Sequence, residues 1–247
     1  MDNEALRREL GFLRDMGFTH LDVGPSSALR APSPRERGEG HHNPSPRDSG
    51  QRVADGRVRG DLLAELGAIA RACTKCKLAG TRTQVVYGVG SPNADLMFIG
   101  EAPGRDEDLK GEPFVGRAGQ LLTDIIKAMQ LTRDDVYIAN VIKCRPPENR
   151  NPEADELEAC RPYIRRQIEL IQPKVIVTLG KFALQSLTEK SHAVSSARGQ
   201  WLEWNGIKVM PTYHPAYLLR TPAAKKDVWM DMKQVMAELG ISRDASA

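Results

Sequence analysis

The sequence predicts an α/β fold: a central, mainly parallel four-stranded sheet flanked by helices on both faces. Four short apolar runs have the β-branched and aromatic content of buried strands and are bounded by turn-forming residues. Helical patterns separate these runs, and such strand–helix alternation is typical of a parallel sheet covered on both faces. With 247 residues, 40% of them hydrophobic, the chain is long enough for one sizeable core.

The elements follow in chain order from the apolar patterns. The predicted strands are LMFIG (96–100), VYIAN (136–140), VIVTLG (175–180) and VMPTY (209–213). Predicted helices run from Asp61 to Cys73 and over 118–130, 153–171, 181–187 and 223–239. In open sheets of this kind, ligands bind at the carboxyl ends of the strands. Because the distinctive polar motifs come directly after predicted strands, we expect the functional site at that edge.

The first sixty residues differ from the rest. A short helix is predicted for Asn3–Met16, where leucines recur at helical spacing. From Gly24 to Gly60 the chain is rich in Pro, Ser, Gly and Arg and has few large apolar residues. Such a segment cannot bury enough surface to offset its ordering entropy and is predicted to be a disordered linker. We therefore expect an extension, residues 1–60, and a domain, residues 61–247.

The composition and the first residues argue against a secreted or membrane-spanning protein. The beginning, MDNEALRRELGFLRDM, interleaves acids and bases and lacks the apolar region of a signal peptide. No apolar run approaches the roughly 20 residues that a membrane helix requires. A net charge of +3 permits a nucleic-acid partner without requiring one. We expect a cytoplasmic protein without a membrane partner.

The cysteines form the most specific pattern. The chain has four, Cys73, Cys76, Cys144 and Cys160, which matches one tetrahedral metal or iron–sulfur site. Such ligation suits a structural zinc or a 4Fe–4S cluster, and the spacing does not separate the two. The alternatives are two disulfides or four unrelated thiols. Disulfide frameworks are typical of small secreted chains, so the C-x2-C pair favours a metal site.

Polar motifs follow three of the predicted strands. They are GEAPGRDED (100–108), NVIKCRPPENRNP (140–152) and YHPAYLLR (213–220). Taken singly, the first loop is better explained as a solvated turn with a helix-capping acid. Taken together, the three loops bring amide, imidazole and carboxylate groups to one edge of the sheet.

These motifs resemble the family-4 uracil-DNA glycosylases, the iron–sulfur branch of the uracil-DNA glycosylase superfamily. The match is carried by GEAPGRDED at 100–108, GEPFVGRAGQLL at 111–122, VYIANVIKCRPPENRNP at 136–152, VIVTLGKFA at 175–183, GIKVMPTYHPAYLLR at 206–220 and the four cysteines in order. The resemblance covers roughly Asp61 to the C-terminus. It implies a monofunctional hydrolase that removes uracil from single- or double-stranded DNA in base excision repair. Enzymes that process abasic sites would act downstream, and the protein would be a nucleoid-associated monomer.

The resemblance also implies a cofactor and excludes two relatives. A mainly structural 4Fe–4S cluster would be held by the four cysteines. Ala102 stands where family-1 enzymes carry a water-activating aspartate, so their mechanism does not transfer directly. The segment RPPENRNP lacks the histidine nucleophile of the crosslinking relatives. Two alternatives stay open: a same-fold glycosylase with broader deaminated-base specificity, and a non-catalytic iron–sulfur protein that binds nucleic acid.

Roles in uracil binding follow residue by residue from the resemblance. The Asn140 amide would read the Watson–Crick edge of uracil, donating to O4 and accepting from N3–H. Phe114 would stack on the flipped base, and Ala102 would offer backbone contacts. His214 would donate a hydrogen bond to O2 as negative charge develops there.

Catalysis and DNA binding complete the expected site. The resemblance favours Glu101 and Glu107 as catalytic carboxylates, with Asn149 positioning the water or the nucleotide. Leu218 would be an apolar wedge that fills the space left by the flipped base. Basic residues near the same edge would contact phosphates: Arg220, Arg145, Arg150 and Lys143.

Overall fold

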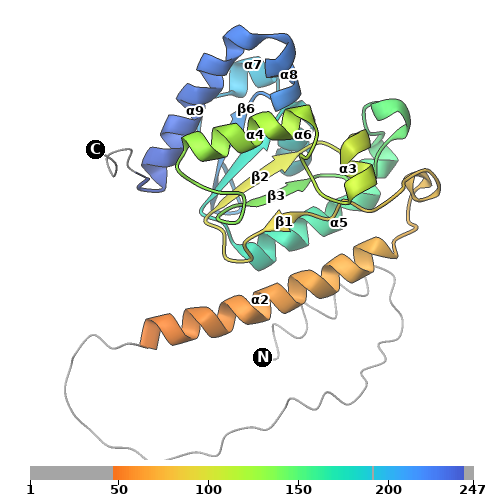
Figure 1. Ribbon diagram of the computed structural model, residues 1–247, viewed down its shortest axis with the longest axis horizontal. Coiled ribbons are helices and arrows are strands. Elements are labelled where there is room, and N and C mark those ends of the chain that lie inside the picture. Colours follow the sequence, from red (N-terminus) through yellow and green to blue (C-terminus); the bar gives the residue numbers. More distant parts are fainter. Residues whose placement is uncertain (1–46, 191, 242–247) are drawn as a thin grey trace, which may run out of the picture. The chain divides into compact units, whose positions relative to one another are not determined.

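A computed structural model describes residues 47–190 and 192–241 of the chain (Figure 1). Its centre is a six-stranded sheet of order β1-β3-β2-β4-β6-β5. Four strands run parallel at the predicted positions: β2 (Leu96–Gly100), β3 (Tyr137–Asn140), β4 (Val175–Leu179) and β6 (Ile207–Thr212). The predicted mainly parallel α/β sheet is confirmed, whereas the predicted count of four strands is wrong.

The two additional strands pair antiparallel at the edges of the sheet. They are β1 (Val89–Gly90), beside β3, and β5 (Leu202–Trp204), beside β6. Each is too short to give the apolar run on which the prediction relied. Gly90 also has a φ of 125°, and a Cβ there would lie 1.9 Å from the Val136 carbonyl oxygen. Tertiary pairing, rather than local propensity, therefore creates these edge strands.

Helices connect and cover the strands. The α-helices are α2 (Arg47–Arg71), α3 (Arg105–Lys110), α4 (Arg117–Ala128), α5 (Ala154–Ile171), α6 (Lys181–Thr188), α7 (Val194–Ala197), α8 (Pro215–Arg220) and α9 (Lys225–Glu238). Short 3₁₀ turns lie at η1 (Lys77–Gly80), η2 (Pro147–Asn149) and η3 (Pro222–Ala224). The four helices predicted after residue 100 correspond to α4, α5, α6 and α9, and the short helices α3, α7 and α8 were not predicted.

The main core lies between the sheet and helices α4, α8 and α9. Leu122 and Ile126 of α4 and Met232 of α9 are fully buried in one apolar cluster with Phe98 of β2. Helix α5 covers the opposite face of the sheet (Figure 1). Burial on both faces explains why the parallel strands read as continuous apolar runs. This packing fixes the carboxyl ends of the parallel strands along one edge.

Helix α2 differs from its prediction. It begins at Arg47, so the stretch from Arg47 to Gly60, assigned by sequence to the linker, is helical. Arg59 explains part of this extension, since it donates to the Ile171 carbonyl at 3.2 Å and to Oε1 of Gln172 at 2.9 Å. The predicted helix at residues 3–16 and the rest of the predicted linker lie outside the described residues.

The chain divides into the units Met1–Asp48 and Ser49–Ala247, and the sheet belongs to the second. The predicted boundary at residue 61 stays a prediction. Within residues 47–190 and 192–241, no helix has the length and apolar character needed to cross a membrane.

Candidate active site

A pocket of about 520 Å³ lies where strands β2, β3 and β6 end. All the predicted catalytic and uracil-binding residues line it: Glu101, Ala102, Glu107, Phe114, Asn140, Asn149 and His214. Parallel strands deliver these residues to one place because their carboxyl ends share an edge. Residues more than a hundred positions apart in sequence therefore form a single site.

Asn140 is the last residue of β3, and only 1% of it is exposed. Its Oδ1 is buried and has no hydrogen-bond partner within the described part of the chain. An unpaired buried acceptor costs free energy, so a ligand donor is the natural partner. Gly100, the neighbour of Asn140 on β2, makes room for this group, since a Cβ there would lie 2.4 Å from Oδ1. The pocket thus offers a buried acceptor to an N–H group.

Phe114 brings an aromatic ring to the same space. A Cβ at Gly100 would lie 2.5 Å from Cζ of Phe114, so the ring lies directly over that glycine. The ring centroid is 5.6 Å from that of His214, with the two planes tilted by 33°. Phe114 has a φ of 55°, in the left-handed region that aromatic residues rarely adopt. Its ring position therefore depends on contacts that hold this backbone.

Glu107 supplies some of those contacts. Its Oε1 accepts hydrogen bonds from the backbone N–H groups of Val115 and Gly116, both at 2.9 Å. Its Oε2 accepts from the N–H of Gly104 at 3.1 Å. The carboxylate thereby joins the loop after β2 to the loop before α4. Both oxygens of Glu107 are thus engaged in hydrogen bonds that organise the pocket.

Glu101 follows β2 directly and is half-buried in the pocket wall. Burial raises the pKa of its carboxyl from near 4.5 to about 7. A carboxyl that titrates near neutral pH inside a pocket is typical of an acid–base group. The structure thus separates the two carboxylates that sequence reasoning left equivalent.

His214 caps the N-terminus of α8. Its Nδ1 accepts a hydrogen bond from the N–H of Ala216 at 3.1 Å, so the neutral ring carries its hydrogen on Nε2. Burial, followed by the nearby charge of Arg220, lowers the pKa of His214 to about 4, and Glu107 opposes this effect. Near neutral pH the imidazole is therefore an uncharged donor through Nε2–H.

The three arginines that were predicted to contact phosphates have different surroundings in the structure. Arg220 is exposed at the pocket, as expected for a phosphate contact. Arg150 also lines the pocket, but its guanidinium pairs with the buried Glu156 at 2.9 and 2.5 Å. Arg145 is not among the lining residues and donates from Nε to Oδ1 of Asn149 at 2.7 Å. Arg145 and Arg150 therefore hold the loop that carries Asn149.

Two other residues that were predicted to contact DNA, Leu218 and Lys143, are buried. Leu218 is 1% exposed and packs in the main core, because α8 turns it towards the sheet. Its neighbours Tyr217 and Leu219 are 37% and 39% exposed, and Tyr217 lines the pocket. Lys143 is 2% exposed, and its Nζ donates to the Asn140 carbonyl at 2.7 Å and to Gln167 at 2.6 Å. Lys143 is therefore part of the interior under β3.

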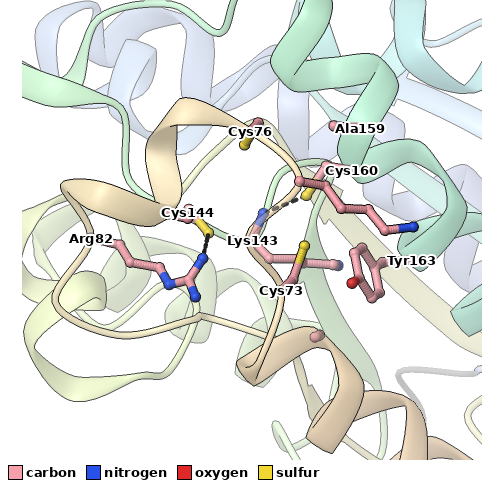
Figure 2. Close-up of a pocket in the computed structure, with 11 residues that line it drawn as sticks. Cys73, Cys76, Arg82, Lys143, Cys144, Ala159, Cys160 and Tyr163 are labelled. Atoms are coloured by element: carbon pink, nitrogen blue, oxygen red, sulfur yellow. Dashed lines mark hydrogen bonds between the residues drawn. The ribbon is translucent and has the colours of Figure 1, made fainter. Parts of the chain in front are cut away.

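The four cysteines surround a second, smaller hollow, shown in Figure 2. Cys73 and Cys76 come from the turn after α2, Cys144 from the loop after β3 and Cys160 from α5. None is in a disulfide. Burial raises the pKa of the Cys160 thiol to about 12, and the charge of Lys143 opposes this shift. All four cysteines thus line one hollow, whereas the metal or cluster that they were predicted to hold stays a prediction.

Two comparisons with known proteins agree with this arrangement. The family model described as "Uracil DNA glycosylase superfamily" matches residues 87–233. A type-4 uracil-DNA glycosylase of Sulfurisphaera tokodaii is 47% identical over 74% of this chain and 86% of its own length. The type-4 enzymes of Saccharolobus solfataricus and Archaeoglobus fulgidus are 45% and 47% identical, over 72% and 71% of this chain and 86% and 90% of theirs.

The chain belongs to the type-4 uracil-DNA glycosylases.

Within this family member, the structure adds two glycines that make room for pocket residues and that sequence reasoning missed. Gly100 ends β2 and gives space to Asn140 and Phe114. Gly119, at the start of α4, allows the Phe114 carbonyl to approach, since a Cβ there would lie 1.9 Å from that oxygen. A glycine directly after an apolar strand was a usable signal for Gly100. Gly119 gave none, because the contact that requires it is tertiary.

Proposed function

We propose that this type-4 uracil-DNA glycosylase binds a uracil flipped out of DNA in the pocket and hydrolyses its N1–C1′ bond. The product is an abasic site, which downstream repair enzymes must process. The observation that carries the proposal is the unpaired Oδ1 of Asn140 in a pocket that also holds the neutral donor His214. An acceptor and a donor of this kind match N3–H and O2 of uracil.

Base recognition rests on Asn140 and Phe114. Oδ1 of Asn140 accepts from uracil N3–H, and its NH₂ group donates to O4. Cytosine presents an acceptor at N3 and an amino group at C4, so both amide groups would face groups of their own kind. Each buried group left unpaired costs about 1–3 kcal/mol, which favours uracil. The Phe114 ring stacks on the base, and the backbone near Ala102 borders it.

The chemistry needs one bond broken and one formed. The N1–C1′ electron pair leaves with uracil, whose O2 accepts a hydrogen bond from Nε2–H of His214 as charge develops. A water oxygen then bonds to C1′, and ionised Glu101 takes the proton that the water loses. Asn149 positions this water. Glu107 acts indirectly, through the loops that its two oxygens hold.

DNA contacts come from the rim of the pocket. Arg220 is exposed there and holds a phosphate. Because Leu218 is buried, the exposed aromatic ring of Tyr217 is the side chain that fills the gap in the duplex. Tyr217→Ala should therefore slow excision from duplex DNA more than from single strands. Equal losses on both substrates would remove Tyr217 from this role.

The four-cysteine hollow fits a 4Fe–4S cluster, which we propose as a structural cofactor. Within the described residues, no three His, Cys, Asp or Glu side chains converge closely enough for a single metal ion. Thiols that border one hollow without converging suit a cluster, in which each thiolate bonds a different iron. Cys73, Cys76, Cys144 and Cys160 would hold it and thereby join three segments of the chain.

A panel of duplexes tests the activity. Each duplex carries one uracil, hypoxanthine, xanthine or cytosine, and the purified protein is assayed for free base and for abasic sites. We expect excision of uracil and none of cytosine. Comparable release of hypoxanthine or xanthine would show the broader glycosylase. Binding of the uracil duplex without any base release would show a non-catalytic protein and overturn the proposal.

A further inference from the structure

The loop that presents Phe114 is held from two sides. On one side, Glu107 accepts from the N–H groups of residues 115 and 116. On the other, Arg133 donates from Nη2 to the Pro113 carbonyl at 2.8 Å and from Nη1 to the Phe114 carbonyl at 3.2 Å. An anion therefore holds the N–H groups of this segment, and a cation holds its carbonyls.

This double contact has a specific consequence for the backbone. The Phe114 φ of 55° lies in the left-handed region, which persists only where the surroundings over-determine it. A guanidinium offers several N–H donors in a fixed planar fork, so one arginine can fix two successive carbonyls. Gly119 also helps to fix this loop, because without a Cβ it lets the Phe114 carbonyl approach α4 closely.

Arg133 lies in the chain between α4 and β3 and is itself anchored. It is half-buried, and its Nη1 also donates to Oγ1 of Thr123 on α4 at 3.3 Å. It does not line the base pocket and cannot touch the base, whereas Phe114 does line it. Any effect of Arg133 on excision must therefore pass through the loop.

We propose that Arg133 is a positioning residue for base stacking: its guanidinium holds residues 113 and 114 so that the Phe114 ring stays over Gly100, beside Asn140 and His214. The inference rests on the proposed stacking role of Phe114. Arg133→Met removes both carbonyl donors while keeping much of the side-chain bulk. The ring then loses its fixed position, and the flipped base loses its stacking partner.

A double-mutant cycle tests this with single-turnover excision of uracil from a short duplex. Arg133→Met should lower the rate constant for excision by about tenfold and leave duplex affinity nearly unchanged. In a Phe114→Ala background, the same substitution should change the rate by less than about twofold, because the ring it positions is gone. Arg133→Lys, which keeps the charge but loses the planar fork, should fall between Met and the parent.

Lys127→Met is the matched control. Lys127 and Arg133 line one surface pocket outside the base pocket. Across the described residues, however, the Lys127 side chain makes no hydrogen bond to the Phe114 loop. This variant should excise uracil at the parent rate. Iron content and melting temperature of every variant separate a positioning effect from loss of fold, and Arg133→Lys still carries the test if Arg133→Met does not fold.

The outcomes separate the inference from its premise. Equal losses from Arg133→Met in the parent and Phe114→Ala backgrounds would overturn the role of Arg133. A parent-like rate for Arg133→Met would do the same. If Phe114→Ala alone excised uracil normally, the stacking role of Phe114 would itself be wrong.

Discussion

The active-site pocket and the four-cysteine hollow draw on one stretch of chain but treat their polar groups differently. Asn140 serves the pocket, whereas Cys144 and Cys160 serve the hollow. The buried Oδ1 of Asn140 has no hydrogen-bond partner among the residues that the structure describes. The thiols instead meet donors from the protein: Arg82 reaches Cys144 at 3.3 Å, and the backbone N–H of Lys143 reaches Cys160 at 3.3 Å.

This difference matches two roles: substrate recognition in the pocket and structural support around the hollow. Within the described residues, the pocket leaves Oδ1 of Asn140 without a protein partner, so a substrate can supply one. Groups around the hollow are held by the chain, as a structural site requires. Lys143 joins the two regions, because its backbone contacts a cysteine while its Nζ holds the Asn140 carbonyl. Changes in the pocket should therefore alter rate at constant stability, and changes in the hollow should alter stability first.

The largest expected effect on rate comes from His214→Ala. Removing one donor that acts on developing charge typically costs about 10²–10³ in rate, or roughly 3–4 kcal/mol. Because this contact strengthens in the transition state, the variant should bind uracil-containing DNA and keep its iron while single-turnover excision collapses. A loss of less than about threefold would mean that His214 does not stabilise the leaving uracil.

Cys160→Ser tests the hollow, where we expect a loss of stability rather than of rate. We expect it to lower iron content and the yield of folded protein, because a ligand that joins α5 to the hollow is lost. The fraction that folds with its cluster should excise uracil at near the parent rate. Iron analysis, visible absorption and rate on the same sample measure this. A folded, colourless and fully active protein with one zinc per chain would contradict the iron–sulfur assignment.

Asn140→Asp should have the next largest effect on rate. A carboxylate cannot donate to uracil O4, and its charge opposes the charge on the leaving base. Losing one buried hydrogen-bond pairing costs about 1–3 kcal/mol, so we expect a fall of roughly 5- to 150-fold. Parallel assays on uracil and cytosine duplexes measure it. Excision of uracil at the parent rate would exclude Asn140 as the reader of the base and point to Asn149.

The raised pKa of Glu101 predicts how the rate of uracil excision depends on pH. Since burial raises the pKa of Glu101 to about 7, the ionised form that accepts the proton of water is lost as pH falls below that value. The rate constant at pH 6 should be about tenfold below its alkaline plateau. Glu101→Gln should be slow and lack this limb. A parent profile that is flat from pH 8 to 5.5 would remove Glu101 as the base.

The same carboxyl makes a prediction about stability. Its pKa is higher in the folded protein than in the unfolded chain, so the folded state holds a proton that the unfolded state releases between about pH 4.5 and 7. The contribution of Glu101 to the free energy of unfolding should therefore decrease as pH rises through this window. Glu101→Gln should unfold with a weaker pH dependence there, as denaturant titrations can show.

The smallest effect is expected at the N-terminus. A protein that starts at Arg47 should keep parent kinetics and melting temperature. One that starts at Asp61 loses both hydrogen bonds of Arg59 to the end of α5, each worth about 0.5–1.5 kcal/mol. It should excise uracil normally but melt several degrees lower, at about 2–4 °C per kcal/mol. Equal melting temperatures for the two would show that α2 before Asp61 adds no stability.

Local patterns predicted the four parallel strands and the long helices after residue 100, because buried parallel strands read as apolar runs. The members of the site were predicted from the resemblance of their motifs to the family-4 uracil-DNA glycosylases. Number and spacing favoured one site for Cys73, Cys76, Cys144 and Cys160 but left unrelated thiols open, and the structure places all four around one hollow. Asn140 and His214 were predicted from motifs and do line the pocket.

The separate roles of the site residues could be read only from the folded chain. Glu101 and Glu107 look alike in sequence, but packing leaves one open to the pocket and gives the other three N–H partners. Leu218 fits a wedge by its spacing from His214, yet the rotation of α8 buries it. The role of a polar or apolar side chain depends on burial and on partners distant in sequence, and these exist only once the chain has folded.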